Sequence, residues 1–326
     1  MIEERPSPEF LARFRARAGD AGWLSFADFM ALALYDPEVG YYRRKQNRVG
    51  YGGGTDFFTA STSGPIFGEM IVAACVTLLG ESNPADHTFV EIGAEPGRSV
   101  LDGVTHPFAG TRILRLAEPL EIKGQCVVFS NELFDAQPCR RFVFRAGRWH
   151  ERGVTLSGDV LSEIEFACES PPAAIPSLAS EGYEIDAPFA AVGLAEKIAA
   201  QPWRGLFIAC DYGKSWRELV EATPAGTARA YFRHTQTNDL LARAGEQDLT
   251  CHVCWDWLVE ALGRSGFAAP RLDSQEGFFV RHAGAFLAAT SAAEAAGFSA
   301  RKRALTQLLH PAHLGQKFQV LHALRR

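Results

Sequence analysis

The sequence predicts an α/β protein built around a doubly wound, mainly parallel sheet, with an antiparallel β insertion and helical additions at both ends. Three short apolar runs, each followed by polar residues, are the first observation: Thr88–Ile92, Cys126–Phe129 and Leu206–Cys210. Strands buried on both faces of a parallel sheet have this pattern. A glycine-rich turn follows the first run, as in a strand–turn–helix unit. At Phe142 the pattern changes to alternating apolar and polar residues, which indicates antiparallel strands.

Composition sets the scale of the molecule and excludes several classes. The 326 residues carry 33 Lys and Arg against 38 Asp and Glu, a formal charge of −5. This acidic balance argues against a nucleic-acid clamp, which needs a basic stripe. Because 47% of the residues are apolar, the chain can bury a large core, and general disorder is excluded. At roughly 150 residues per domain, the length suggests two domains or one domain with a large insertion.

The N-terminal region, residues 1–80, is predicted to be mainly helical. Phe26–Leu34 has helical apolar spacing, and Pro65–Leu79 has the continuous apolar character of a buried helix. Between them, Tyr51–Thr55 contains three consecutive glycines and is predicted to form a loop.

Residues 81–138 supply the first half of the predicted sheet. The strand at Thr88–Ile92 runs into the glycine turn Gly93–Gly97, and a helix is expected to start at Gly97 or Arg98. Ile113–Leu116 is predicted to be a further buried strand.

The insertion occupies residues 139–200. An antiparallel meander is expected over about 140–170, after the helix that follows the fourth strand, with strands at Phe142–Phe144, Trp149–Leu156 and Val160–Phe166.

Residues 201–326 return to the sheet. A helix is predicted at Trp255–Ser265 with Gly266 placed to end it. The tail from Ala283 to Arg326 is Ala-rich and is predicted to be helical, with an interruption at His310–Pro311.

Two segments at the predicted carboxyl edge of the sheet carry groups suited to ligand chemistry. In Glu91–Gly97, the glycines let the backbone approach a ligand, and a helix start would present N–H groups to an anion. Asn131–Pro138 places two carboxylates and an amide just past a buried strand. The alternatives are a plain connector for the first segment and a helix N-terminus capped by Asn131 for the second. Asp211–Gly213 could line the same crevice or form a simple turn.

Metal and redox roles find little support in the spacing along the chain. Cys251 and Cys254 have the CxxC spacing, but a second pair at metal-binding spacing is absent, and the first cysteine falls within a predicted strand. The three C-terminal histidines have no cysteine or carboxylate at useful spacing: His310, His313 and His322. We therefore expect no metal site, and the seven cysteines are expected to be reduced thiols that fill core space.

Further short motifs are spread along the whole chain. Those of the first half are Tyr35–Tyr42, Asp56–Thr59, Phe67–Glu69, Glu91–Ala94 and Asn131–Pro138. Those of the second half are Asp211–Gly213, Gly226–Thr227, Arg233–His234, Gly245–Asp248, His310–Pro311, Gly315 and Phe318–Leu321. In this order and spacing they resemble the MidA-like S-adenosylmethionine-dependent methyltransferases, whose mitochondrial members help to assemble respiratory complex I by methylating an arginine.

The resemblance implies a Rossmann-like methyltransferase sheet with S-adenosylmethionine at its carboxyl edge and a protein arginine as substrate. The residues that would then bind the cofactor are Glu91, Gly93, Ala94 and Gly97 around the methionine end, Glu118 at the ribose, and Asn131. Glu132 and Asp135 are the candidate catalytic residues, because carboxylates can hold the planar guanidinium fork and orient one nitrogen toward the methyl group.

The cofactor half departs from the family in length. Gly93 and Asn131 are only 38 positions apart, and Pro119–Gln125 is too short to hold both a helix and a strand. We therefore predict that one helix and one edge strand are lost, which would leave the adenosine side of the site open to water.

A second departure lies in the glycine turn itself, where Glu95 stands in place of the family's middle glycine. If the turn needs a left-handed conformation there, a Cβ would cost roughly 1–2 kcal/mol. Together with the shortened segment, this predicts weak or absent cofactor binding. The alternative function is thus a non-catalytic binding or assembly protein that keeps the methyltransferase shell.

Location and partners follow from what the sequence lacks. Its longest apolar run, Met70–Leu79, is about half of the ~20 residues that a membrane span needs. The acidic N-terminus does not resemble a targeting segment. We expect a cytoplasmic protein of bacterial type with a protein substrate or partner and no nucleic acid, and leave its oligomeric state open.

Overall fold

The computed structural model describes residues 6–44, 48, 55–56, 63–294, 297 and 299–326. The chain forms two compact units, each assembled from three separate stretches. The first unit comprises Met1–Phe57, Asp135–Val192 and Lys214–Cys254; the second comprises Phe58–Phe134, Gly193–Gly213 and Trp255–Arg326. The predicted glycine loop at 51–54 lies outside the described residues, as do positions 57–59 of the motif Asp56–Thr59.

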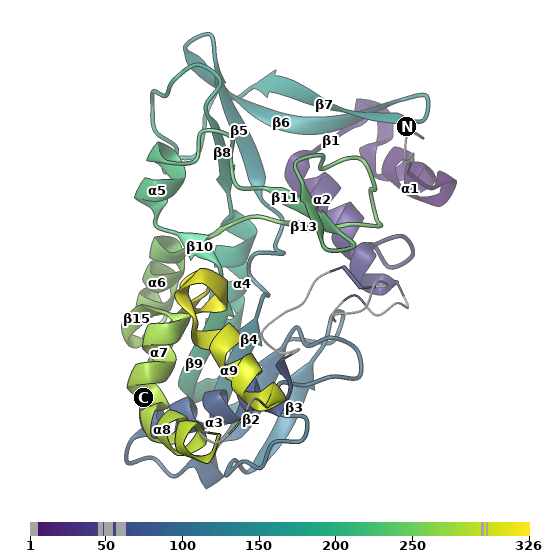
Figure 1. Cartoon of the computed structure of the whole chain (residues 1–326). Helices are drawn as coiled ribbons and strands as arrows, with labels where there is room; N and C mark the ends of the chain where they lie inside the picture. The colour runs from purple at the N-terminus through teal and green to yellow at the C-terminus, as the bar shows by residue number, and fades with distance from the viewer. Residues whose placement is uncertain (1–5, 45–47, 49–54, 57–62, 295–296, 298) are drawn as a thin grey trace. The chain divides into compact units, whose positions relative to one another are not determined.

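A six-stranded sheet forms the centre of the second unit (Figure 1). Its order is β15-β16-β9-β4-β2-β3. The bounds are β2 (Thr88–Ile92), β3 (Gly110–Leu114), β4 (Gly124–Asn131), β9 (Trp203–Asp211), β15 (Ala268–Ser274) and β16 (Gln319–Arg325). The pairs β3–β2, β2–β4 and β4–β9 are parallel, whereas β16 is antiparallel to both neighbours.

The predicted parallel sheet is confirmed: β2 has the predicted bounds, and β4 and β9 extend beyond their predicted apolar runs. The strand predicted at Ile113–Leu116 starts and ends earlier, as β3, and is an edge strand whose residues are mostly exposed or half-buried rather than buried. The helical prediction for the tail was wrong at its end, where β16 pairs with β9 and β15 inside the sheet.

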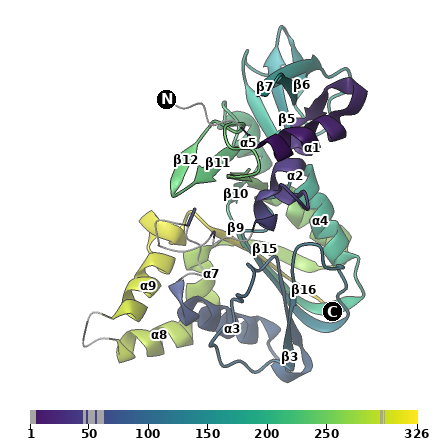
Figure 2. The ribbon, with the colours of Figure 1, turned by 90° about the vertical axis from the view of Figure 1, so that its right-hand side faces the viewer.

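Both faces of the inner strands β2, β4 and β9 are buried, as their continuous apolar sequences predict, whereas most residues of the edge strands β3 and β15 are exposed or half-buried. Alternate residues of β9 separate the two faces: Leu206 and Ile208 join the core beneath α3 (Pro65–Leu79), and Phe207 packs against Phe267 on the other face. The first face is also covered by α7 (Gln275–His282), α8 (Gly284–Ala293) and α9 (Ala300–Leu309), as Figure 2 shows.

The opposite face holds α6 (Trp255–Arg264), which ends near Gly266 as predicted, and the second half of α4 (Phe189–Ala199). The Trp255 indole donates to Gln319 of β16 at 2.5 Å, and the Arg264 guanidinium pairs with Glu196 of α4 at 3.1 Å. These contacts fix the two helices to one another and to the antiparallel edge of the sheet.

The connections around β2 and β3 differ from the prediction. No helix starts at Gly97 or Arg98: residues 93–109 contain only turns and irregular chain before β3. Residues 115–123, between β3 and β4, are also irregular. The predicted loss of an edge strand and a helix is therefore confirmed, and the structure adds the loss of a second helix after the glycine turn.

An irregular loop replaces that missing helix as the cover of β2. Val100, Leu101 and Phe108 join the apolar core beneath α3, where the Phe108 ring lies 5.4 Å from that of Phe89. A Cβ on Gly68 of α3 would lie 2.0 Å from the Val100 carbonyl oxygen, so only glycine permits this approach of loop and helix. Apolar burial thus continues over β2 without regular secondary structure.

The first unit contains the predicted antiparallel meander. Strands β5 (Arg140–Arg145), β6 (Arg148–Ser157) and β7 (Val160–Ala167) pair in sequence, and β1 (Trp23–Ser25) and β8 (Glu184–Ala187) complete the sheet. Ala146 and Gly147 both have positive φ angles, as a two-residue hairpin turn requires. The meander directly follows β4 and precedes α4, so its predicted place after the fourth strand's helix was wrong.

Ion pairs between one buried arginine and three acids connect three strands of this sheet. The buried Arg141 guanidinium of β5 pairs with Glu163 of β7 at 2.7 Å, and with Glu184 and Asp186 of β8 at 2.9 and 2.8 Å.

The remaining elements of the unit are α1 (Pro8–Ala18), α2 (Phe26–Tyr35), α5 (Trp216–Glu221), β11 (Arg229–Phe232), β12 (Thr235–Thr237) and β13 (Asp248–Thr250). A short pair, β10 (Gly213–Lys214) with β14 (Val253–Cys254), is also present.

All seven cysteines are free thiols, and all except Cys168 are buried, which agrees with the predicted space-filling role. Among the described residues, no helix combines the length and apolar character needed to cross a bilayer.

Candidate functional site

The glycine turn after β2 lies where the sequence predicts it, and its first glycine is required by packing. Gly93 has φ +83°, and a Cβ there would lie 2.8 Å from the Leu133 Cδ1 atom. Its N–H donates to the Leu114 carbonyl at the end of β3 at 2.9 Å. The turn is therefore held close to the ends of both β3 and β4.

Glu91, predicted to hold the cofactor, uses its carboxylate within the protein. It accepts from the Ser99 hydroxyl at 2.6 Å and from the Val100 N–H at 3.0 and 3.1 Å. Burial raises the pKa of this carboxyl, and the hydrogen bonds from Ser99 and Val100 oppose that shift. Glu91 thus anchors the loop that replaces the helix, a role that the sequence pattern did not reveal; its contact with a cofactor stays a prediction.

Glu95 does not carry the backbone strain that its position suggested. It is absent from the described non-glycine residues with positive φ, so its Cβ has no left-handed conformation to oppose. Gly97 does have φ +71°, with open space around its Cβ position. The condition for the predicted strain of roughly 1–2 kcal/mol at Glu95 is therefore not met. Ala94, between the two glycines of the turn, is partly buried.

Glu118 lies in the turn that follows β3 and is exposed. Its carboxylate accepts from the Arg115 N–H at 3.0 Å, while its own N–H donates to the Arg115 carbonyl at 3.0 Å. Ala117, between them, has φ +71°. This acid is thus placed just past a strand end, as a ribose ligand would be, and its carboxylate also closes its own turn.

Asn131 and Glu132 form a constrained pair at the end of β4. The Asn131 amide donates to the Glu132 carboxylate at 2.8 Å, and the Asn131 Oδ1 atom is buried without a hydrogen-bond partner among the described residues. Glu132 has φ +51°, a conformation that non-glycine residues rarely adopt. Such strain often marks functional positions. The alternative interpretation, a helix capped by Asn131, is excluded because residues 132–139 contain no helix.

Asp211 holds this strained segment in place from the neighbouring strand. Its fully buried carboxylate accepts from the N–H groups of Leu133 and Phe134 at 3.2 and 2.9 Å, and from that of Tyr212 at 2.9 Å. The Glu132 N–H also donates to the Cys210 carbonyl at 2.9 Å. The sequence left open whether Asp211 lines the crevice or only forms a turn; in the structure its carboxylate positions the backbone around Glu132.

Asp135 belongs to the first unit, where it is buried near a group of tyrosines. Burial raises the pKa of Tyr35 and of Tyr42, and the charges of Asp248 and Asp135 raise both further. The Tyr42 hydroxyl donates to Asp248 at 2.9 Å, and the Tyr35 hydroxyl donates to the Ala136 carbonyl at 2.8 Å. Two buried acids and two stacked aromatic rings therefore share one region.

A second set of contacts joins the dispersed motifs of the first unit. The buried Tyr41 hydroxyl donates to Asp56 at 2.8 Å, and the same carboxylate accepts from the Arg233 N–H at 2.9 Å. His234 lies 3.1 Å from the Thr55 hydroxyl. Arg233 and His234 both have positive φ angles, so this turn is also strained.

The histidines need one correction. His322 was expected to lack a carboxylate partner, but its Nε2 atom lies 3.1 Å from Asp273 Oδ2, because β15 and β16 are paired. The two residues are 49 positions apart, so spacing along the chain could not reveal the contact.

Known proteins resemble this chain in both sequence and fold. A sequence profile described as "Putative S-adenosyl-L-methionine-dependent methyltransferase" matches residues 110–271, about half of the chain. The matched range begins at β3 and contains both Asn131 and Glu132. The protein arginine methyltransferase NDUFAF7, mitochondrial, of Danio rerio is 24% identical over 304 residues, covering 74% of this chain and 69% of the relative.

The structural match is more extensive. A crystal structure from Burkholderia thailandensis bound to S-adenosyl-homocysteine superposes with a TM-score of 0.84 and 25% identity, covering 98% of this chain and 94% of that one. The chain belongs to the MidA-like family of S-adenosyl-L-methionine-dependent methyltransferases. A native structure from the same organism, 24% identical with a TM-score of 0.80, has the same fold; the match covers 98% of this chain and 94% of that one.

Membership of the MidA-like family gives the shortened half of the sheet a context. The Burkholderia thailandensis chain superposes over 94% of its length and holds S-adenosyl-homocysteine. A fold closely similar to this one thus holds that ligand in a relative.

Proposed function

We propose that this protein transfers a methyl group from S-adenosylmethionine to an arginine side chain of a protein. The observation that carries the proposal is the near-complete structural match to a protein that holds S-adenosyl-homocysteine, the product that the cofactor leaves after methyl transfer. The substrate class is taken from the zebrafish relative, which is described as a protein arginine methyltransferase.

The residues at the ends of β2 and β4 fit a cofactor of this kind. The buried Asn131 Oδ1 atom has no hydrogen-bond partner among the described residues and can accept from an amino or hydroxyl group. The turn with Gly93, Ala94 and Gly97 would bind the methionine end through its backbone. Glu118, exposed beyond β3, would accept from the ribose hydroxyls.

Two features of the sequence, Glu95 and the shortened segment after Gly93, predicted weak or absent binding of the cofactor. The structure and the relatives give reasons against that prediction for both. Glu95 adopts an ordinary backbone conformation. The fold that this chain shares with the Burkholderia thailandensis protein holds S-adenosyl-homocysteine there, which supports binding here despite the shortened segment. These observations favour a functional cofactor site.

The cofactor supplies an electrophilic methyl group on a sulfonium. The protein must align a guanidinium nitrogen with that methyl group. It must also bind a guanidinium that stays positively charged, because the pKa of this group exceeds ~12. We assign this task to Glu132 and Asp135, whose carboxylates can accept from the N–H groups of the fork. The strained, multiply anchored backbone of Glu132 supports a fixed orientation for its carboxylate.

The second candidate function is a binding or assembly protein without catalysis. It is favoured by Glu91, whose carboxylate is already engaged by Ser99 and Val100. In this case the strand-end acid anchors a loop and leaves the cofactor's amino group without that partner.

A labelled methyl group separates the two functions. The full chain is incubated with methyl-labelled S-adenosylmethionine and an extract from cells that lack the protein, and mass spectrometry locates the label. The proposal expects methylated arginine, reduced about 10²-fold by Glu132→Gln and by Asp135→Asn. Glu221→Gln, an exposed acid paired with Arg217, is the matched control and should retain activity. Measurable S-adenosyl-homocysteine binding with no labelled residue would favour the binding protein instead.

The place of action stays a prediction of the sequence. We propose a cytoplasmic protein with a protein substrate, while the zebrafish relative is described as mitochondrial.

A further inference from the structure

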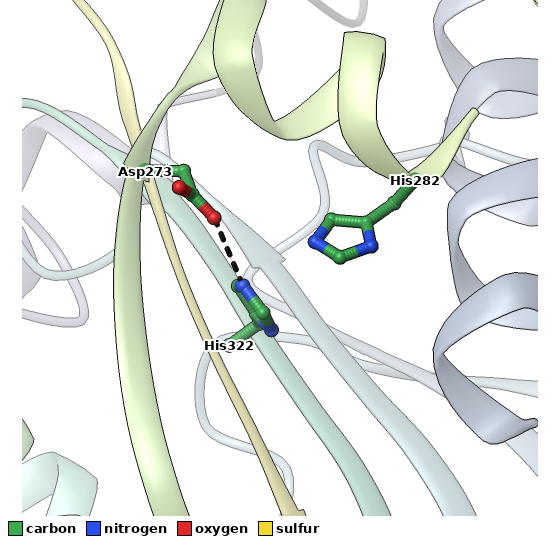
Figure 3. Close-up of side chains that lie close together, drawn as sticks. All are labelled: Asp273, His282 and His322. Atoms are coloured by element: carbon green, nitrogen blue, oxygen red, sulfur yellow. Dashed lines mark hydrogen bonds and ion pairs between the residues drawn. The ribbon is translucent and has the colours of Figure 1, made fainter. Parts of the chain in front are cut away.

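Three side chains from three neighbouring elements of the second unit lie close together (Figure 3). Two of them are on β15 and β16, which β9 and β4 separate from β2 and its glycine turn. Asp273 lies on β15, His322 on β16, and His282 is the last residue of α7. In the register, Asp273 faces Val320 and Arg271 faces His322, so Asp273 and His322 lie on the same face of the sheet. Helix α7 follows β15 directly and crosses this face, which brings His282 to the pair.

The polar atoms of the three residues are close together. One ligand atom from each lies within 4.8 Å of the other two. The His322 Nε2 atom is 3.1 Å from Asp273 Oδ2, and the rings of His282 and His322 are 5.1 Å apart between centroids. Figure 3 shows the His282 ring turned toward the Asp273–His322 pair.

His282 supplies the observation that ordinary packing leaves unexplained. Its Nε2 atom is buried and has no hydrogen-bond partner among the described residues. A buried ring nitrogen normally finds a partner, because leaving it unsatisfied costs ~1–3 kcal/mol. Asp273 and His322 already satisfy one another, whereas this nitrogen points into the same space without a bond.

We propose that Asp273 Oδ2, His282 Nε2 and His322 Nε2 form a binding site for a divalent transition-metal ion of the Zn²⁺ type. Two imidazoles and one carboxylate are a typical ligand set for Zn²⁺, with water at the fourth position. A tetrahedral ion with bonds of ~2.0–2.2 Å holds its ligands roughly 3.3 Å apart, so rotation of the side chains must close the present spacing.

Arg281 provides an outer contact for such a site. Its guanidinium pairs with Asp273 Oδ1, which leaves Oδ2 as the oxygen directed at His322. A partner on the second oxygen orients a ligating carboxylate. Arg281 and Arg271 also add positive charge nearby, so we expect weaker binding than at a closed site with four protein ligands.

The expected effect of the ion is on stability. It would connect β15, β16 and the end of α7, in the half of the sheet that carries β9, and would bind only the folded chain. At a hundredfold excess over the dissociation constant, such a ligand should raise the melting temperature on the order of several degrees. This proposal does not depend on methyl transfer, and the two can fail separately.

The test uses the full chain after chelation and dialysis, titrated with Zn²⁺ by calorimetry and with Co²⁺ by visible absorption. We expect one ion per chain, and a Co²⁺ spectrum without the strong thiolate charge-transfer band that cysteine ligands would give. His282→Gln should weaken binding at least tenfold while the far-UV circular dichroism stays unchanged. Asp273→Asn should weaken binding similarly.

Two control variants address the other metal-binding groups of the chain. The double variant His310→Gln with His313→Gln removes the other close histidine pair, and Cys168→Ser removes the thiol that is not fully buried. Both should bind Zn²⁺ as the wild type does. Absence of saturable binding, unchanged affinity in His282→Gln, or loss of binding in either control would overturn the proposal.

Discussion

The two halves of the large sheet are covered in different ways. Around β9, β16 and β15, helices α6 and α7–α9 pack on the strands, as in a regular α/β layer. Around β2, β3 and β4, both parallel connections lack a helix, and the loop 99–108 adds its apolar side chains to the core beneath α3. The comparison teaches that an irregular loop can supply part of the apolar cover that crossover helices usually give a parallel sheet.

The two halves of the sheet also differ in the chemical groups that they carry. The helix-covered half holds the Asp273, His282 and His322 cluster beneath a helix, whereas the loop-covered half holds the strained Glu132 and the glycine turn at the strand ends. Loops can place side chains and backbone groups at a ligand in geometries that a helix cannot adopt. We therefore propose that the helix-covered half contributes mainly to stability and that the loop-covered half carries the reaction.

The largest expected effect tests whether the loop is a true part of the core. Phe108→Ala removes a ring packed on Phe89 and should lower the free energy of unfolding by about 3–5 kcal/mol. Leu308→Ala in α9, on the helix-covered half, should cost about 2–5 kcal/mol. Urea denaturation measures both. A cost below ~1 kcal/mol for Phe108→Ala would show that the loop only rests on the sheet.

The glycine turn offers a matched pair of substitutions. Gly93→Ala meets both a positive φ and the Leu133 side chain at 2.8 Å, whereas Gly97→Ala meets a positive φ in open space. We expect Gly97→Ala to cost about 1–2 kcal/mol, and Gly93→Ala to cost more because Leu133 must move. Thermal denaturation of the two variants gives the comparison. Equal losses would mean that the contact with Leu133 is easily relaxed.

A smaller effect should appear in the pH dependence of stability. Burial raises the pKa of Glu91 in the folded state, so protonation favours folding; this contribution is fully present below the unfolded pKa and is lost as pH rises through the folded pKa. Compared with Glu91→Gln, which has no charge to lose, the wild type should therefore gain relative stability as pH falls from about 7 to about 4. Denaturation of both proteins across this range measures the slope. A difference that grows with rising pH would contradict the raised pKa.

The smallest effect is expected at Glu95. Since its backbone is not left-handed, Glu95→Gly relieves no strain and should leave stability within about 1 kcal/mol of the wild type. S-adenosyl-homocysteine should raise the melting temperature of both proteins equally. A larger shift in Glu95→Gly would show that the side chain obstructs the cofactor.

The sequence predicted those parts of the fold in which one pattern decides the structure. The apolar runs located β2, β4 and β9, and the bounds of α3 match the prediction because Pro65 starts the helix and Gly80 follows its end. The helix expected at Gly97 or Arg98 does not form. Ser99 and Val100 bond to Glu91 instead, and such long-range partners cannot be read from local propensity.

The same limit applies to the site. Asn131, Glu132 and the glycines were placed at the strand ends because a parallel sheet gathers its carboxyl ends at one edge. The role of Asp211 in holding Leu133 and Phe134 depends on a contact across 77–78 positions, and the metal-type cluster depends on the register of β15 and β16. Neither the Asp211 contacts nor the cluster can be predicted from the spacing of the motifs.

The central claim is that the loop-covered half binds the cofactor, and calorimetric titration with S-adenosyl-homocysteine tests it most directly. We expect one molecule per chain in the wild type, binding at least tenfold weaker in Gly93→Ala because the Leu133 segment is displaced, and unchanged affinity in His282→Gln in the helix-covered half. Absence of binding to the wild type, or equal affinity in Gly93→Ala, would contradict the claim.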